Sequence, residues 1–181
     1  TPLEALPAVA EPLGLRTRRG RGVRAVGREL LVAQLAQRLA RERTNLLLVG
    51  EPGTGKSAVL HDAIRQAART KDDATLEARR EERPDEPPPP QQFWRTTGQR
   101  LISGMKYLGQ WEARCEKLIE ELGETNGTLC ADELLELVRV GGQDTSESVA
   151  AFFAPYLERG ELRLVSEASP AQLDAIRVVS L

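Results

Sequence analysis

The sequence predicts an α/β fold in which crossover helices cover both faces of a parallel β-sheet. Three observations indicate this class. Short apolar segments of strand length alternate along the chain with longer segments whose apolar residues recur at helical spacing. The segment NLLLV at 45–49 is apolar and ends in a glycine-rich turn, as a buried parallel strand does. The 181 residues are enough for one domain of this kind with a hydrophobic core.

Two segments are expected to lie outside the regular structure. Residues 1–22 are rich in Pro, Gly and Arg, which is typical of a tail or an interdomain linker, so the domain itself is expected at 23–181. Residues 71–92 are charged, include a run of prolines near their end and contain almost nothing to bury. We therefore expect a mobile insertion there, extended where the prolines follow one another.

The remaining segments follow one another as strands joined by helices. Before the first strand, residues 28–43 place Leu31, Leu35 and Leu39 at helical spacing. Strands are expected at 45–49, 93–97, 127–133 and 161–169, and helices at 28–43, 56–70, 110–124 and 146–160. The last residues, 176–181, fit either a fifth strand or part of a helix.

The composition argues against several classes of function. The 25 basic and 27 acidic residues nearly cancel, and a net charge of −2 gives no bulk attraction to nucleic acid or to membranes. The basic run at 16–28 is interpreted as a solvated linker. The sequence contains no apolar run long enough for a membrane-spanning helix. Cys115 and Cys130 lack the spacing of metal ligands and indicate a reducing compartment, so a cytoplasmic protein is expected.

A glycine-rich turn follows the first strand. It fits the phosphate-binding loop pattern G-x-x-x-x-G-K-[ST] in full, as GEPGTGKS at 50–57. Its glycines let the backbone wrap closely, so that successive N–H groups face phosphate oxygens at the start of a helix. Lys56 adds a positive charge at the β- and γ-phosphates, and the Ser57 hydroxyl can bind Mg²⁺. The predicted nucleotide-binding residues here are Gly50, Glu51, Pro52, Gly53, Thr54, Gly55, Lys56, Ser57 and Ala58.

The alternative for this turn is a glycine-rich connection that holds no ligand.

Hydrolysis would need, besides the loop, an acid that organises Mg²⁺ and a base that orients the attacking water. The strand expected at 127–133 ends in two acids, Asp132 and Glu133. Asp132 can help to hold the metal, and Glu133 can polarise the water as a general base. The alternative is a strand end that carries two solvated acids.

Several collinear motifs together resemble AAA+ ATPases of the Clp family, specifically the first nucleotide-binding domain of the ClpB, ClpA and ClpC unfoldases and disaggregases. The motifs are VGR at 26–28, GEPGTGKSAVL at 50–60, LISGMKYLGQWEARCEKLIEEL at 101–122, GTLCADELLELVRVGG at 127–142 and FFAPYLERGELRLVSEAS at 152–169. The resemblance implies a P-loop NTPase fold, a three-layer sandwich that binds ATP or ADP with Mg²⁺ and hydrolyses ATP. It also implies that Ala25 and Val26 lie beside the adenine.

The resemblance further implies partners. Clp proteins assemble as hexameric rings of AAA+ subunits, and Lys106 and Tyr107 match the K-Y-x-G loop that grips unfolded polypeptide in the central pore. An aromatic ring suits this role because it presses on any chain without reading its sequence. The alternative for Tyr107 is ordinary packing near the following helix.

The sequence also departs from the family pattern. The family's sensor stretch reads Gly-Ala-Thr-Thr, whereas this chain has Ser166-Glu167-Ala168-Ser169. Ser169 is therefore the candidate for the polar catalytic group that contacts the γ-phosphate or the attacking water. The alternative is that this group is absent and Ala168 stands in its place. The family's helical lid is expected to be absent after the sensor strand, together with most of the stretch that carries its arginine finger.

Three hypotheses about function follow from the sequence. The first is the ATPase core of a Clp-like protein-remodelling machine. The second is a degenerate module that holds nucleotide but hydrolyses it poorly, which the altered sensor stretch favours and Lys56, Asp132 and Glu133 oppose. The third is a P-loop domain that acts on DNA, which only the basic run at 16–28 supports.

Overall fold

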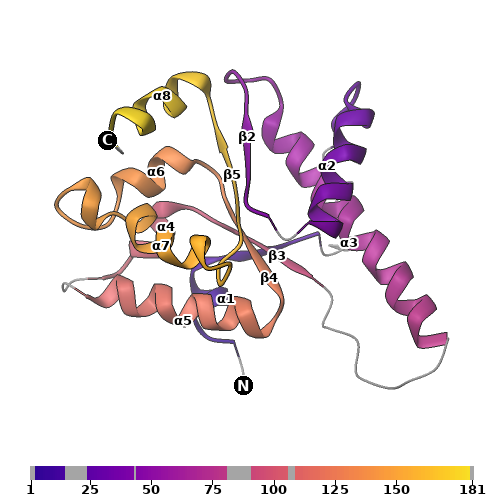
Figure 1. The fold of residues 1–181 in the computed structure, drawn as a ribbon, viewed down its shortest axis with the longest axis horizontal. Helices are drawn as coiled ribbons and strands as arrows, with labels where there is room; N and C mark the ends of the chain where they lie inside the picture. The colour runs from indigo at the N-terminus through magenta and orange to yellow at the C-terminus, as the bar shows by residue number, and fades with distance from the viewer. Residues whose placement is uncertain (1–2, 15–23, 43, 81–90, 106–108, 180–181) are drawn as a thin grey trace.

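A five-stranded sheet forms the middle layer of the computed structural model, which describes residues 3–14, 24–42, 44–80, 91–105 and 109–179 (Figure 1). The strand order is β1-β3-β4-β5-β2. The strands are β1 (Glu11–Leu13), β2 (Leu46–Val49), β3 (Gln92–Thr96), β4 (Gly127–Ala131) and β5 (Leu164–Ala168). The pairs β3–β4, β4–β5 and β5–β2 are parallel, as expected, whereas the short edge strand β1 is antiparallel to its neighbour β3.

Helices cover both faces of this sheet and complete the three-layer α/β sandwich (Figure 1). One face is covered by α2 (Glu29–Arg41) and α3 (Lys56–Arg80), which pack closely against each other. The other face is covered by α1 (Ala5–Val9), α5 (Gln110–Glu124) and α7 (Val149–Glu158). The remaining helices are α4 (Gly98–Ile102), α6 (Leu134–Arg139), the 3₁₀ turn η1 (Thr145–Glu147) and α8 (Pro170–Val179).

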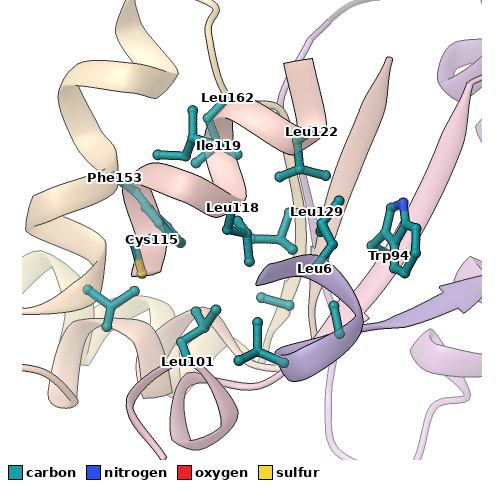
Figure 2. Close-up of a cluster of buried hydrophobic side chains, with 14 of the residues drawn as sticks. Leu6, Trp94, Leu101, Cys115, Leu118, Ile119, Leu122, Leu129, Phe153 and Leu162 are labelled. Carbon is teal, nitrogen blue, oxygen red and sulfur yellow. The ribbon is translucent and has the colours of Figure 1, made fainter. Parts of the chain in front are cut away.

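Alternation along the strands divides the core between the two faces. Phe93, Cys130 and Val165 belong to the cluster under α2 and α3. Trp94 and Leu129, each next to one of these residues in sequence, belong to the cluster on the opposite face. Figure 2 shows this second cluster; its labelled residues are Leu6, Trp94, Leu101, Cys115, Leu118, Ile119, Leu122, Leu129, Phe153 and Leu162.

The amino-terminal segment differs from the expectation of a linker or tail at 1–22. Residues 5–13 form α1 and β1, and Leu6 is completely buried in the core. The carboxylate of Glu121 on α5 anchors them: its Oε1 accepts the backbone N–H groups of Glu4 and Ala5 at 2.9 and 3.0 Å, and its Oε2 accepts that of Leu6 at 2.8 Å. The expectation is therefore wrong for this segment, because contacts distant in sequence order it.

Three other expectations need correction. The helix after the loop continues to Arg80, so the first part of the expected insertion at 71–92 is helical, while residues 81–90 lie outside the described residues. Strand β2 is at one edge of the sheet and is not wholly buried: Leu47 and Val49 are 38% and 44% exposed. The buried face of α2 contains Val32, Ala36 and Leu39, with Leu31 exposed.

Other expectations agree with the structure. The helix expected at 110–124 coincides with α5, and the strands expected at 93–97 and 127–133 correspond to β3 and β4. Residues 176–179 belong to helix α8 and not to a fifth strand. None of the described helices combines the length and apolar composition needed to cross a membrane.

Candidate nucleotide-binding site

The glycine-rich loop connects the end of β2 to the start of α3, the strand-to-helix position that a phosphate-binding loop requires. Gly53 and Gly55 have φ angles of +78° and +82°, which residues with a side chain rarely adopt. The backbone N–H of Gly50 donates to the carbonyl of Ala168 at 3.1 Å, so the end of β5 fixes the start of the loop. A Cβ added to Gly50 would lie 3.1 Å from Thr54 Oγ1 and 3.3 Å from Lys56 Cδ, so a side chain there would crowd these two loop residues.

Lys56 is the first residue of α3, and its side chain extends back across the loop. Its Nζ donates to the carbonyl oxygens of Gly50 and Glu51 at 2.8 and 2.9 Å. These acceptors are uncharged and partly open to solvent, so a phosphate group could replace them as partners of the ammonium group. The Lys56 ammonium group is therefore positioned at the loop, and no described carboxylate forms a salt bridge with it.

Ser57, the next residue, donates its hydroxyl to Glu167 on β5. The Ser57 Oγ lies 3.1 and 2.9 Å from the two carboxylate oxygens of Glu167, which is only 6% exposed. Burial raises the pKa of Glu167, and the negative charge of Asp132 adds to this, while the bond from Ser57 acts in the opposite direction. The loop thus has a buried carboxylate beside its hydroxyl.

Asp132 follows β4 and is held by Arg95 on β3. The Arg95 Nε and Nη2 donate to the two Asp132 carboxylate oxygens at 2.9 and 2.7 Å. This hydrogen bonding raises the pKa of Arg95. His61 on α3 lies within the field of this pair: burial lowers the pKa of His61 and the charge of Arg95 lowers it further.

Register explains why these groups meet. Arg95 pairs with Cys130, and Cys130 pairs with Val165, so these three residues lie on the same face of the sheet. Two positions further along their strands, Asp132 and Glu167 follow on that face, toward α3. The carboxyl ends of β2, β5 and β4 therefore bring the loop, Glu167 and Asp132 to one edge of the sheet, the usual place for a ligand in an open α/β fold.

The two other candidate catalytic residues lie at the same edge. Glu133 is exposed at the N-cap position of α6, and it makes no side-chain hydrogen bond or ion pair with the described residues. Ser169 is buried directly after β5; its Oγ accepts the backbone N–H of Gln172 at 3.1 Å, while its own N–H donates to the Gln172 side chain at 2.8 Å. The structure thus gives Ser169 the position of a helix cap for α8.

An adjoining hollow of about 200 Å³ continues from the loop toward α2. Gly50, Thr54 and Lys56 line it together with the apolar side chains of Leu31 and Leu48. A base needs such an apolar wall beside the phosphate cradle. A larger hollow of about 590 Å³ lies at the opposite ends of the strands, and its described lining contains none of the predicted nucleotide-binding residues.

The residues expected beside the adenine are close to this region without lining the hollow. The Ala25 N–H donates to Asp62 of α3 at 3.3 Å, which fixes the segment before α2 against the helix that follows the loop. Val26 is 86% exposed in the adjoining turn and is thus open to a ligand. Lys106 and Tyr107, expected to contact polypeptide, lie outside the described residues.

The residues present fit Mg²⁺ bound together with a nucleotide. Ser57, Asp132 and Glu167 supply the hydroxyl and carboxylate oxygens that this ion prefers. Within the described part of the chain, no group of three or more His, Cys, Asp or Glu residues could hold a metal. At nucleotide sites, Mg²⁺ is usually held by one or two carboxylates together with phosphate oxygens and water.

No sequence pattern indicates a role for Arg95 or for Glu167. Arg95 appears in the sequence only as one residue of a predicted strand, and Glu167 only as a departure from a family pattern. The signal that was available is the charge itself. Strands β3 and β5 are buried between helices, and a charged residue inside such a strand needs a partner or a function.

Comparison with known proteins agrees with this geometry. Residues 24–165 match the family model described as the AAA ATPase domain. The chaperone protein ClpB of Oceanobacillus iheyensis is 29% identical over 162 residues, which is 88% of this chain and 18% of that protein. The ATP-binding subunit ClpC of the Clp protease of Staphylococcus epidermidis is 30% identical over 142 residues, or 77% of this chain and 16% of that protein.

Solved structures of Hsp104 are also similar. The Saccharomyces cerevisiae Hsp104–ADP complex superposes with a TM-score of 0.67 at 25% identity, and a closed state of Hsp104 with ATPγS and FITC casein superposes with a TM-score of 0.69 at 27% identity. Each comparison covers 96% of this chain and 28% of the Hsp104 chain. The chain spans less than a fifth of the length of the two curated relatives, at 18% and 16%.

Proposed function

Because this chain belongs to the AAA ATPase domain family, we propose that it binds ATP and ADP with Mg²⁺ and hydrolyses ATP as the core of a Clp-like protein-remodelling machine. The observation that carries the proposal is the loop at 50–57, which has its glycines in the required conformation, Lys56 across it and Ser57 at the start of α3. The similarity to ClpB, ClpC and Hsp104 supports the assignment of the domain to a machine of this kind.

The roles of the side chains follow from their positions. Backbone N–H groups at the start of α3 and the Lys56 ammonium group would bind the phosphates. Ser57 and Asp132 would hold Mg²⁺, which when bound offsets negative charge on the phosphate oxygens. Glu133, which no described residue engages, would orient the attacking water and accept its proton.

The proposed partners are those of the related machines. We assign to this protein a ring of AAA+ subunits in the cytoplasm, with an unfolded polypeptide held by Lys106 and Tyr107. Hsp104 has been solved together with casein, which supports a polypeptide substrate for a related domain. A ring neighbour would supply the arginine that completes the site, so slow hydrolysis is expected for this chain alone.

A specific observation favours a second candidate function, a nucleotide-binding module with weak or no hydrolysis. Arg95 occupies both oxygens of Asp132, and Ser169 caps a helix. Both groups are thereby engaged within the protein. In this alternative, the domain would change its conformation or its partners with nucleotide state without turning over.

The test is a titration with a fluorescent ATP analogue and Mg²⁺, with phosphate release followed in the same samples. Lys56→Ala should abolish binding, and Lys117→Ala should leave it unchanged, because Lys117 lies on the surface of α5, where it pairs with Glu120 at 3.9 Å. Slow phosphate release that Glu133→Gln removes would favour the motor. Binding without release would favour the module, and absence of binding in the unmodified chain would refute both.

A further inference from the structure

Glu167 is a buried carboxylate of β5 whose hydrogen bonds, among the described residues, all come from the loop hydroxyl of Ser57. We propose that Glu167 is the positioning residue for Mg²⁺ in this domain. It holds the Ser57 hydroxyl in the orientation that the metal requires. The inference rests on the nucleotide-binding function proposed above.

The Ser57 hydroxyl donates its hydrogen to Glu167 and keeps its lone pairs free. A hydroxyl has one hydrogen to donate and two lone pairs to offer. At 2.9 and 3.1 Å from the two oxygens of Glu167, the hydrogen of Ser57 is directed to the carboxylate, which leaves the lone pairs for a cation. Glu167 is itself fixed, because β5 pairs with β2 on one side and with β4 on the other.

Asp132, the acid at the end of β4, is paired with Arg95. Arg95 donates two hydrogen bonds to Asp132, at 2.9 and 2.7 Å, so both carboxylate oxygens already have a planar cation as partner. The structure contains no hydrogen bond between Ser57 and Asp132 among the residues it describes. Asp132, at the end of β4, is thus paired with Arg95 of β3. Glu167, at the end of β5, is the acid that contacts the loop hydroxyl.

The coordination of Mg²⁺ makes the orientation of Ser57 important. Mg²⁺ at nucleotide sites takes few protein ligands, so the orientation of each one affects affinity strongly. Replacing a group that orients a metal ligand typically lowers metal affinity by about 10- to 100-fold. We therefore expect Glu167 to matter for the metal and not for the nucleotide itself.

The experiment measures Mn²⁺ binding by electron paramagnetic resonance in the presence of saturating ADP. The proteins are the unmodified chain, Glu167→Gln and Asp132→Asn, which both keep the size of the side chain. Glu167→Gln should weaken Mn²⁺ binding at least about 10-fold, and Asp132→Asn should weaken it as well, because Asp132 is proposed to hold the metal. Binding of fluorescent ADP in EDTA should be retained in Glu167→Gln, which shows that the variant is folded.

A double-mutant cycle tests whether Glu167 acts through Ser57. Ser57→Ala removes the hydroxyl, so adding Glu167→Gln to it should cost little further Mn²⁺ affinity. Equal losses for Glu167→Gln in both backgrounds would overturn the proposed role. It would also be overturned if Asp132→Asn lost the metal while Glu167→Gln kept it.

The same data separate this inference from the function on which it rests. ADP binding by the unmodified chain, together with either of the contrary metal results, refutes the role of Glu167 alone. A chain that binds no ADP with or without metal refutes nucleotide binding, and the positioning role fails with it. Should Glu167→Gln not fold, Ser57→Ala decides: unchanged Mn²⁺ affinity in that variant overturns the proposal.

Discussion

The carboxylate of Glu121 anchors the amino-terminal segment, so we expect Glu121→Gln to loosen α1 and β1 from the domain. Glutamine has nearly the same size and keeps one carbonyl oxygen. Its amide NH₂ group, however, must replace one carboxylate oxygen and would then face a backbone N–H. Either the Leu6 N–H, or those of Glu4 and Ala5, would lose their acceptor.

The magnitude follows from these bonds. A buried N–H left without an acceptor costs about 1–3 kcal/mol. Losing the negative charge weakens the bonds that remain, since bonds to a charged acceptor are roughly twice as strong as neutral ones. Together these effects destabilise the segment by about 3 kcal/mol. In a domain of this size, that corresponds to a melting temperature lower by about 6–12 °C if the segment unfolds with the rest.

Urea unfolding and hydrogen exchange measure this change. The amide of Leu6 should exchange about 100-fold faster in Glu121→Gln, since every 1.4 kcal/mol is about tenfold. Glu120→Gln is the matched control: Glu120 is the preceding residue, exposed, and pairs only weakly with Lys117, so its loss should stay within about 0.5 kcal/mol. Equal stability and equal Leu6 exchange in the two variants would refute the anchoring role.

Three further predictions follow from burial and from the pKa of these groups. Burial alone would raise the pKa of Glu121, but hydrogen bonds from three backbone N–H groups hold this pKa below its ordinary value. The stability that Glu121 contributes should therefore be complete above about pH 4.3 and should fall as the pH drops through the lower pKa of the folded state. In a pH series of urea melts, Glu121→Gln should lack this part of the acid dependence. Phe153 is completely buried, so Phe153→Ala should lower the free energy of unfolding by about 3–5 kcal/mol in urea melts, and a loss below 1 kcal/mol would contradict its place in the core. Burial raises the pKa of the Cys115 thiol to about 12 and raises that of Cys130 as well, so neither should react with a thiol reagent at pH 8 until urea unfolds the chain; labelling of the native protein would show that the burial is wrong.

Much of the fold could be predicted because its signals are local. The sequence predicts helix α5 at its observed bounds because Trp111, Cys115, Leu118 and Leu122 recur at helical spacing, and the structure buries all four. The phosphate-binding loop could be predicted for a similar reason. Its pattern, its preceding strand and its following helix are contiguous in the sequence.

The parts that could not be predicted depend on partners far away in the chain. Residues 5–13 contain no strong local pattern, and the groups that order them, Glu121 and strand β3, lie about a hundred residues later. The same holds for Glu167, whose partner Ser57 precedes it by 110 positions. Parallel strands bring such residues together, and no single stretch of sequence contains that information.

The edge position of β2 affects how molecules of this domain behave toward one another. An edge strand has unpaired backbone groups along one side, and exposed aliphatic side chains make such a strand a template for other chains. In β2 these side chains are Leu47 and Val49, directly before the loop. In concentrated solution, self-association should therefore begin beside the nucleotide site, and a lysine in place of Val49 would oppose it by charge repulsion.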